Sequence, residues 1–196
     1  MSTLDYYNQN ADLFTSGTVN ADVTDLYSHF EPYLPPHASI IDIGCGSGRD
    51  SKYFVEAGYA VTAIDGSREL CKQAELLTGI PVRCILFSEI DYDPIFDGAW
   101  ACSSLLHVPK NEMESVIQKI CKALKPNGVF YASYKYGDTE REVGGRHFSD
   151  YTEKDLPILT GYAPDMYLAE YWISADVRPD RANEKWLNII WRKQAT

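Results

Sequence analysis

Hydrophobic and polar positions follow two alternating periods along the chain. Short apolar runs rich in β-branched and aromatic residues are typical of buried strands, and they occupy residues 40–43, 60–64, 82–87, 96–102 and 129–134. Between them, apolar residues recur every three or four positions, over 47–57, over 67–77 and in a segment that Asn111–Glu114 opens with a capping-box pattern. This alternation predicts a parallel sheet with helices on both faces.

The two ends of the chain depart from that alternation. Residues 4–14 and 22–34 have helical spacing, and Pro35-Pro36 ends the second of these segments. After the fifth strand, residues 152–155 can cap one more helix, and 166–173 and 185–192 then read as strands with no crossover helix between them. Such strands pair antiparallel. We expect one domain over 1–196, with a helical cap (1–36), a core (37–134) and a lid with a terminal hairpin (135–196).

A glycine-rich turn joins the first strand to the next helix. Gly44, Gly46 and Gly48 alternate with Cys45 and Ser47, which leaves bare backbone N–H groups where a ligand can approach. A dinucleotide fingerprint would place its third glycine at position 49, where this chain has Arg49.

The second strand ends in Asp65, 21 positions after Gly44 (65 − 44). An acid at this distance can accept both hydroxyls of a ribose. The turn and acid therefore favour a nucleotide-type ligand. The structural alternative is an ordinary strand–helix turn, with Asp65 capping the helix that follows Gly66-Ser67.

These residues carry a family resemblance. Asp42–Gly48 followed by Asp65 resembles the cofactor signature of class I S-adenosylmethionine-dependent methyltransferases, and Gly48–Ser51 resembles the tellurite-resistance-type branch. Residues 96–109 are similar to segments of small bacterial methyltransferases. The resemblance implies an α/β, Rossmann-like fold with a seven-stranded, mostly parallel sheet in the order 3-2-1-4-5-7-6 and a C-terminal antiparallel hairpin. The implied cofactor is S-adenosylmethionine.

The resemblance also implies which side chains hold that cofactor. Phe87 would lie against the adenine with Ser88 or Glu89 at its edge, and Arg49 would face the methionine carboxylate unless it only pairs with an acid. An aromatic first helix would close over the site, unless its aromatic residues only pack the helix against the fold. The expected cofactor residues are Tyr7, Asp42, Gly44, Cys45, Gly46, Arg49, Asp65, Gly66, Ser67, Phe87, Ser88, Glu89 and Ser103.

The sequence constrains the methyl acceptor less than it constrains the cofactor. Residues 102–105 lack the Asp/Asn-Pro-Pro-aromatic motif of amide and exocyclic-amine methyltransferases, and no Pro-Cys pair of cytosine-C5 enzymes occurs. His107 could serve as a general base or only pack. Lys135 and Arg146, with Arg141 and His147, lie in a glycine-containing segment that is either a positive lid over an anionic acceptor or a solvated loop. The catalytic candidates are His107, Lys135 and Arg146.

Composition limits the partners. The chain has 18 basic and 28 acidic residues, a net charge of −10, so nucleic-acid binding is unfavourable. Five dispersed cysteines without C-x-x-C argue against disulfides, zinc and iron–sulfur clusters, and no metal is expected. With neither a secretory signal nor a transmembrane-length apolar run, we expect a cytoplasmic monomer or homodimer without membrane contact.

The favoured function is methyl transfer from S-adenosylmethionine to a small-molecule acceptor. If residues 135–148 form a positive lid, we expect that acceptor to be an anion. Two alternatives remain open: a tRNA wobble-nucleoside methyltransferase, and a cofactor-binding regulatory subunit without its own acceptor site. A nicotinamide dehydrogenase is opposed by the missing third glycine.

Overall fold

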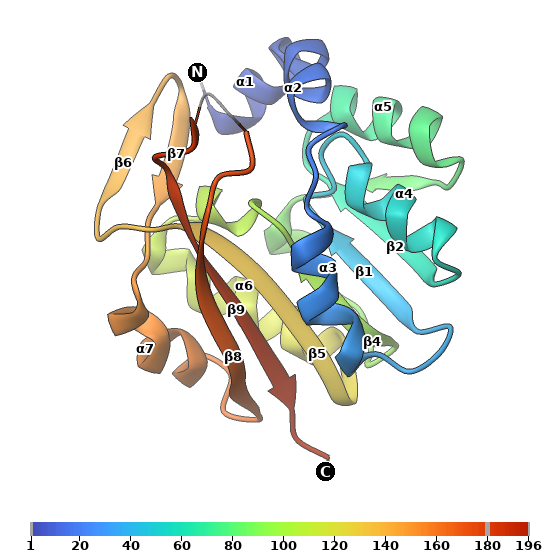
Figure 1. Cartoon of the computed structure of the whole chain (residues 1–196), viewed down its shortest axis with the longest axis vertical. Coiled ribbons are helices and arrows are strands. Elements are labelled where there is room, and N and C mark those ends of the chain that lie inside the picture. The colour runs from blue at the N-terminus through green and yellow to red at the C-terminus, as the bar shows by residue number, and fades with distance from the viewer. Residues whose placement is uncertain (1, 179–180, 196) are drawn as a thin grey trace.

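A seven-stranded sheet forms the centre of the protein (Figure 1). The computed structural model describes residues 2–178 and 181–195. The strand order is β3-β2-β1-β4-β5-β9-β8, where β9 and β8 are the seventh and sixth strands of this sheet along the chain, which confirms the predicted order. The strands are β1 (Ser39–Ile43), β2 (Ala60–Asp65), β3 (Val82–Cys84), β4 (Phe96–Ala101), β5 (Leu124–Lys135), β8 (Met166–Ala175) and β9 (Lys185–Lys193).

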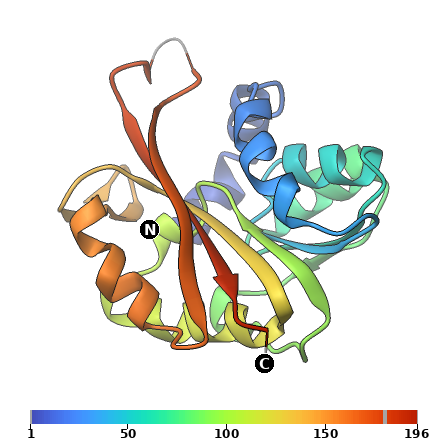
Figure 2. The ribbon, with the colours of Figure 1, turned by 60° about the horizontal axis from the view of Figure 1, so that its bottom comes forward.

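The first five strands pair parallel, and β9 runs antiparallel to both β5 and β8. Parallel strands need covering on both faces. One face packs against α3 (Thr24–Phe30), α4 (Arg49–Glu56) and α5 (Arg68–Thr78), and the other against α6 (Lys110–Ala123) and α7 (Leu156–Gly161). Figure 2 shows these two layers on either side of the strands. The mixed α/β fold is as predicted.

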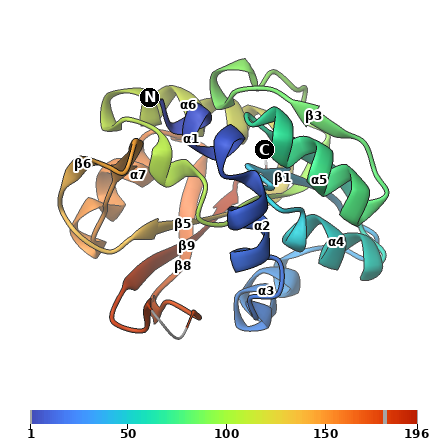
Figure 3. The same cartoon turned by 90° about the horizontal axis from the view of Figure 1, so that it is seen from above.

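The N-terminal segment forms two helices where the sequence predicts one over 4–14. They are α1 (Thr3–Gln9) and α2 (Ala11–Thr18), and they separate at Asn10, whose φ of −116° is not helical. The Asn10 Nδ2 donates to the Tyr6 carbonyl at 2.8 Å, which stabilises the break. Seen from above in Figure 3, α1 lies between α5 and the segment that carries β6 and β7.

Two other boundaries differ from the sequence prediction. The third strand ends at Cys84, because Phe87–Glu89 turn into a 3-10 helix. The capping box predicted at 111–114 is absent: α6 begins at Lys110, after Pro109, without a side-chain cap. The second predicted cap is confirmed, since Thr152 and Asp155 form a capping box at the 3-10 turn Glu153–Asp155 that precedes α7.

A short hairpin forms in the segment for which the sequence predicts either a lid or a solvated loop. Its strands are β6 (Glu140–Val143) and β7 (Arg146–Ser149), paired antiparallel. Gly144 and Gly145 have φ of +59° and +80°, which is the left-handed geometry that two-residue hairpin turns require. Two further 3-10 turns are Glu31–Tyr33 and Leu105–His107. Within the described ranges, no helix is both long and apolar enough to cross a membrane.

Candidate active site

The carboxyl ends of β1, β2 and β4 bring the glycine turn and Asp65 to one edge of the sheet. The Gly44 and Cys45 N–H groups both donate to the Ile64 carbonyl, at 2.9 and 3.0 Å, which ties the turn to the end of β2. In open α/β sheets, ligands bind at this edge. The turn and the acid therefore meet where a ligand is expected.

Two glycines of the turn are required by geometry. Gly44 has φ of +73°, and a Cβ there would lie 2.5 Å from the Ser104 Cβ. Gly46 has φ of +54°, and its Cβ would lie 3.0 Å from the Phe14 ring. Side chains at these positions would be strained and would also fill the space in front of the turn. Both residues contribute to the wall of the cavity described next.

A cavity of about 880 Å³ opens in front of this edge. Asp65 and the glycine turn are among the polar groups of its wall. Its remaining wall is mostly apolar and includes Leu70, Leu86, Phe87, Val108 and Val116. A mostly apolar cavity with a carboxylate in its wall suits a nucleoside, because the base needs flat apolar surface and the ribose needs acceptors for its hydroxyls. We call this space the cofactor cavity.

Asp65 is buried, with 8% of its surface exposed. Its Oδ2 accepts from the Gly46 N–H at 2.9 Å and its Oδ1 accepts from the Ser67 N–H at 2.8 Å. Burial raises the pKa of this carboxyl, and the three backbone N–H groups of Ser67, Gly46 and Gly66 oppose that rise. Each carboxylate oxygen has a second lone pair, so the acid can shape the turn and still accept from a ligand hydroxyl.

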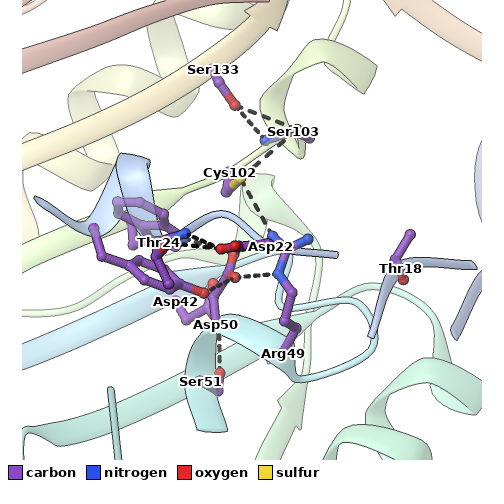
Figure 4. Close-up of polar contacts among 12 residues, drawn as sticks. Thr18, Asp22, Thr24, Asp42, Arg49, Asp50, Ser51, Cys102, Ser103 and Ser133 are labelled. Atoms are coloured by element: carbon purple, nitrogen blue, oxygen red, sulfur yellow. Dashed lines mark hydrogen bonds and ion pairs between the residues drawn. The ribbon is translucent and has the colours of Figure 1, made fainter. Parts of the chain in front are cut away.

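Arg49, at the start of α4, is held by its neighbour in sequence (Figure 4). Its Nε and Nη2 donate to the two Asp50 oxygens at 2.6 and 3.0 Å. Asp50 also accepts from the Tyr27 hydroxyl at 2.6 Å and from the Trp100 indole N–H at 2.9 Å. Although burial opposes ionisation, the Arg49 guanidinium lowers the pKa of Asp50. Arg49 is therefore both paired with an acid and fixed in the wall of a second cavity.

The second cavity, of about 280 Å³, adjoins the first. Six residues line both: Tyr7, Phe14, Gly44, Gly46, Ser103 and His107. We call these six the junction. The wall of the second cavity also contains Trp186 and two of the predicted catalytic residues, Lys135 and Arg146, and after that prediction we call it the acceptor cavity. Ser103 adopts φ of +54°, an uncommon conformation for a residue other than glycine and one that is concentrated at functional sites.

His107 at the junction has both ring nitrogens engaged. Its Nδ1 lies 2.6 Å from the His147 carbonyl oxygen, which can only accept, so Nδ1 carries the proton. Its Nε2 lies 2.7 Å from the Tyr7 hydroxyl and must therefore accept from it. Burial lowers the pKa of His107 to about 4. Burial also raises the pKa of Tyr7, against the effect of the neighbouring Arg146 guanidinium.

Lys135 and Arg146 enter the acceptor cavity from β5 and β7, but their surroundings differ. Lys135 forms an ion pair with Glu184, and its Nζ lies 4.9 Å from the Trp186 ring centroid. Burial lowers the pKa of Lys135 to about 8.

The Arg146 guanidinium lies over two aromatic rings, 4.4 Å from the centroid of Tyr6 and 5.1 Å from that of Phe148. Its Nε is buried without a hydrogen-bond partner, and none of the described acids forms an ion pair with it.

Most of the predicted site residues line these cavities. The cofactor candidates that do so are Tyr7, Gly44, Cys45, Gly46, Arg49, Asp65, Gly66, Phe87, Ser88 and Ser103, and the catalytic candidates His107, Lys135 and Arg146 do so as well. Among the described residues, no group of three His, Cys, Asp or Glu is placed to hold a metal ion.

Three predicted cofactor residues lie outside both walls. Asp42 is 2% exposed beneath the turn, where it accepts from the Ser51 hydroxyl at 2.6 Å, and burial raises its pKa to about 8. Ser67 is buried as the N-cap of α5 and donates to Asn8 Oδ1 at 2.9 Å. Glu89 folds back to accept from the Leu86 N–H at 2.7 Å. These three side chains bond to other groups of the protein and line neither cavity.

Sequence reasoning missed the side chains that hold Asp50. Tyr27 lies on α3 and Trp100 on β4, far apart in sequence, so no spacing connects them. The signal for Asp50 itself was its place next to Arg49, because an adjacent acid and base at a helix start can pair.

Comparison with known proteins agrees with this geometry. Residues 40–128 match the family described as "Methyltransferase domain". The ubiquinone biosynthesis O-methyltransferase of Chromobacterium violaceum is 31% identical over 114 residues, 52% of this chain and 48% of the relative. The malonyl-[acyl-carrier protein] O-methyltransferase of Salmonella typhimurium is 32% identical over 96 residues, 47% of this chain and 37% of the relative. The matched part is thus less than half of either curated relative.

Solved structures extend the similarity to nearly the whole chain. The 1,6-didemethyltoxoflavin-N1-methyltransferase of Burkholderia thailandensis, solved with 1,6-didemethyltoxoflavin and S-adenosylhomocysteine, superposes with a TM-score of 0.74. It is 26% identical and covers 97% of this chain and 84% of its own. A SAM-dependent methyltransferase from Methanosarcina mazei, 22% identical, has the same fold with a TM-score of 0.74 over 87% of this chain and 99% of its own. Residues 40–128 therefore match a methyltransferase domain, and the fold around them is that of the class I enzymes that use S-adenosylmethionine.

Proposed function

We propose that the chain transfers a methyl group from S-adenosylmethionine to a small molecule bound in the acceptor cavity. When bound, the cofactor supplies an activated methyl group on a sulfonium sulfur. The observation that carries the proposal is the junction: a mostly apolar cavity that contains Asp65 and a second cavity lined by five cationic and four acidic side chains share six wall residues. Two ligands placed in these cavities would meet at the junction, as a transfer between them requires.

Each part of the cofactor has a candidate partner in the wall. Asp65 would accept from the ribose hydroxyls, and Phe87 would contact the base. Arg49, held in place by Asp50, would face the carboxylate of the methionine part. The backbone at Gly44 and Gly46 leaves room for the chain between them, since side chains there would occupy that space.

The acceptor side favours a small anion over a nucleic acid. Apart from Arg49, which would face the cofactor, the cations that line the acceptor cavity are Lys135, Arg146, Arg178 and Arg181, and the acids Asp22, Asp25, Asp50 and Asp176 line it as well. Lys135 and Arg178 pair with acids, whereas the buried Nε of Arg146 has no partner among the described residues, and the chain as a whole has a net charge of −10. A small anion can be attracted by the local field of the cavity, whereas a polyanion such as tRNA would also meet the acidic remainder of the surface. The named relatives act on different acceptors, so their names support the reaction type more than any one substrate.

Several finer assignments stay predictions. Gly48–Ser51 supports a place in the tellurite-resistance-type branch. The cytoplasmic location, the state as monomer or homodimer, and the division into cap (1–36), core (37–134) and lid with hairpin (135–196) likewise rest on the sequence.

Calorimetry tests the cofactor half of the proposal. We expect S-adenosylhomocysteine and S-adenosylmethionine to bind and NADH not to bind. Asp65→Ala removes acceptors for the ribose and should weaken S-adenosylhomocysteine by about tenfold or more, since a hydrogen bond to a charged group contributes about 1.5–3 kcal/mol. Asp93→Ala, at an exposed acid outside both cavity walls, serves as a control. Binding of NADH with no heat from S-adenosylmethionine would contradict the proposal.

Arg49→Gln tests the placement of the methionine part. Because Arg49 would contact only the carboxylate, the variant should weaken S-adenosylhomocysteine by about tenfold and leave adenosine within about twofold of wild type. Equal losses for both ligands would mean that Arg49 only supports the fold. Formation of S-adenosylhomocysteine in a screen of carboxylates, thiols, amines and oxyanions then tests the transfer itself.

A further inference from the structure

The junction holds no side chain that is free to remove a proton from an acceptor. Both nitrogens of His107 are engaged, and Nε2 already accepts from the Tyr7 hydroxyl. Protonation of His107 would have to occur in a buried site where its pKa is lowered to about 4. Tyr7 keeps its own proton, because burial raises its pKa.

The acids of the acceptor cavity do not replace that missing base. Asp50 is held by Arg49, Tyr27 and Trp100. Asp176 accepts from Arg178 at 2.6 and 2.8 Å and from the Trp186 indole at 3.1 Å, and despite burial Arg178 lowers its pKa to about 2.

The remaining ionisable side chains in the wall are also poor bases. Asp22 accepts from Thr24, which lowers its pKa, and Asp22 and Asp25 are both exposed. Burial lowers the pKa of Lys135 only to about 8, so the amine is mostly protonated at pH 7, where it forms an ion pair with Glu184. The Cys102 thiol keeps its proton, since burial raises its pKa to about 11.

Beside the junction, Arg146 offers a positive charge and an unused donor. Its guanidinium lies next to the Tyr7 hydroxyl, and its buried Nε–H has no partner among the described residues. A buried donor without a partner is costly unless a ligand satisfies it. A planar anion with two acceptor oxygens matches a guanidinium edge, because the two can form parallel hydrogen bonds. The packing of Arg146 over Tyr6 and Phe148 fixes the plane of that edge.

We propose that the accepting atom is a carboxylate oxygen, held beside the junction by Arg146, and that the product is a methyl ester. The inference rests on the proposed methyl transfer and adds the class of acceptor. A lone pair of the carboxylate oxygen forms the new O–C bond to the methyl carbon, and the S–C bond breaks with its electron pair going to sulfur. The carboxylate charge and the sulfonium charge disappear together, and no proton moves. A neutral alcohol or amine would need the base that the junction lacks.

The first test identifies the bond that is formed. The protein is incubated with S-adenosylmethionine labelled in its methyl group and a deproteinised small-molecule extract of bacterial cells, and the products are treated with mild alkali. Methyl esters release labelled methanol, whereas methyl ethers, amines and thioethers keep their label. We expect most of the label in the volatile fraction. Label that survives alkali would overturn the ester while leaving methyl transfer in place, and the absence of any labelled product would refute both.

The second test concerns Arg146 and needs no natural acceptor. Protein loaded with S-adenosylhomocysteine is titrated with benzoate and with its neutral counterpart benzamide. Benzoate should bind about tenfold or more tightly than benzamide, and Arg146→Gln should abolish that difference while S-adenosylhomocysteine affinity stays within about twofold. Arg146→Lys keeps the positive charge but not the planar pair of N–H donors, so it should restore part of the preference for benzoate. Arg68→Gln, at an exposed arginine outside both walls, is the matched control. Equal binding of benzoate and benzamide by wild type would overturn the assignment of Arg146.

Discussion

His107 illustrates how local contacts decide what a titratable residue can do. A histidine that follows a strand at the ligand edge is an obvious candidate base, and the sequence shows nothing against that role. In the folded protein, its Nδ1–H donates to the His147 carbonyl and its Nε2 accepts from Tyr7. These contacts hold the ring neutral and keep Tyr7 in place at the junction. We therefore assign His107 a positioning role.

The buried, neutral state of His107 should appear in the pH dependence of stability. Its pKa falls from the ordinary 6.5 to about 4 in the folded protein, so between these values the unfolded chain binds a proton that the native chain does not. The free energy of unfolding then rises with pH across this interval, and the contribution is complete above pH 6.5. The full span is on the order of 3 kcal/mol.

Urea unfolding at pH 5, 6 and 7 measures this effect. His107→Gln keeps a donor and an acceptor in similar places but does not titrate, so its free energy of unfolding should fall less than that of wild type between pH 7 and pH 5. His37→Gln, at an exposed histidine, should follow wild type. Parallel pH curves for wild type and His107→Gln would show that His107 is accessible to protons in the folded state.

Where a short motif fixes the backbone, the sequence indicates which single residues lie close together in the fold. The spacing from Gly44 to Asp65 reflects one strand–helix–strand unit, and the two residues do meet at the wall of the cofactor cavity. Glu89 could not be placed in the same way, because it follows a strand that ends early and its carboxylate turns back to the Leu86 N–H. Arg146 was identified from charge alone, and only the fold shows that its Nε lacks a partner.

At the scale of elements, α1 connects the two halves of the site. On the cofactor side, Asn8 Oδ1 accepts from the Ser67 hydroxyl at 2.9 Å and from the Glu69 N–H at 3.4 Å. On the acceptor side, the Thr3 hydroxyl accepts from the His147 N–H at 2.9 Å. Between these contacts, Tyr7 faces both cavities. The helix is therefore part of the wall for both ligands, with no buried residue of its own to anchor it.

Removing one of these contacts should loosen α1. Asn8→Ala deletes the acceptor shared by Ser67 and Glu69, and a lost hydrogen bond destabilises the docked helix by about 1 kcal/mol. Amide hydrogen exchange over residues 3–9 should become roughly fivefold faster, since 1.4 kcal/mol corresponds to a factor of 10. The exposed neighbouring change Gln9→Ala should leave exchange unchanged. If both variants exchange alike, the contacts of Asn8 do not hold the helix.

The elements that were not predicted from the sequence are determined by specific contacts, which the hydrophobic periodicity of the sequence does not show. The hairpin of β6 and β7 had a usable signal, because Gly144-Gly145 between two short polar strands is a typical two-residue turn, but its strands lack an apolar alternation. The break between α1 and α2 was hidden because the hydrophobic period continues through Asn10. The main strands and their parallel direction were predictable, since buried parallel strands are nearly continuous apolar runs, whereas the strand order came from the family resemblance.

At the scale of the whole molecule, binding of a ligand in the cofactor cavity should raise the melting temperature of the protein. A ligand that binds only the native state at 100 times its Kd stabilises it by about 2.7 kcal/mol, which corresponds to a rise in Tm of about 5–10 °C for a chain of this size. We expect this shift with S-adenosylhomocysteine in a thermal unfolding scan and none with NADH at equal concentration. A rise with NADH alone would place a different nucleotide in the cofactor cavity.

The contacts of α1 also have a consequence for how the protein is made. Asn8 contacts a residue 59 positions later, Tyr7 one that is 100 positions later, and Thr3 one that is 144 positions later. At about 5–20 residues per second, a ribosome needs roughly 7–30 s to add the 144 residues between Thr3 and its partner. During that time α1 has no complete docking surface, and an isolated helix of this length is unstable in water. Although α1 is synthesised before any strand of the sheet, it is among the last elements that can reach their final place.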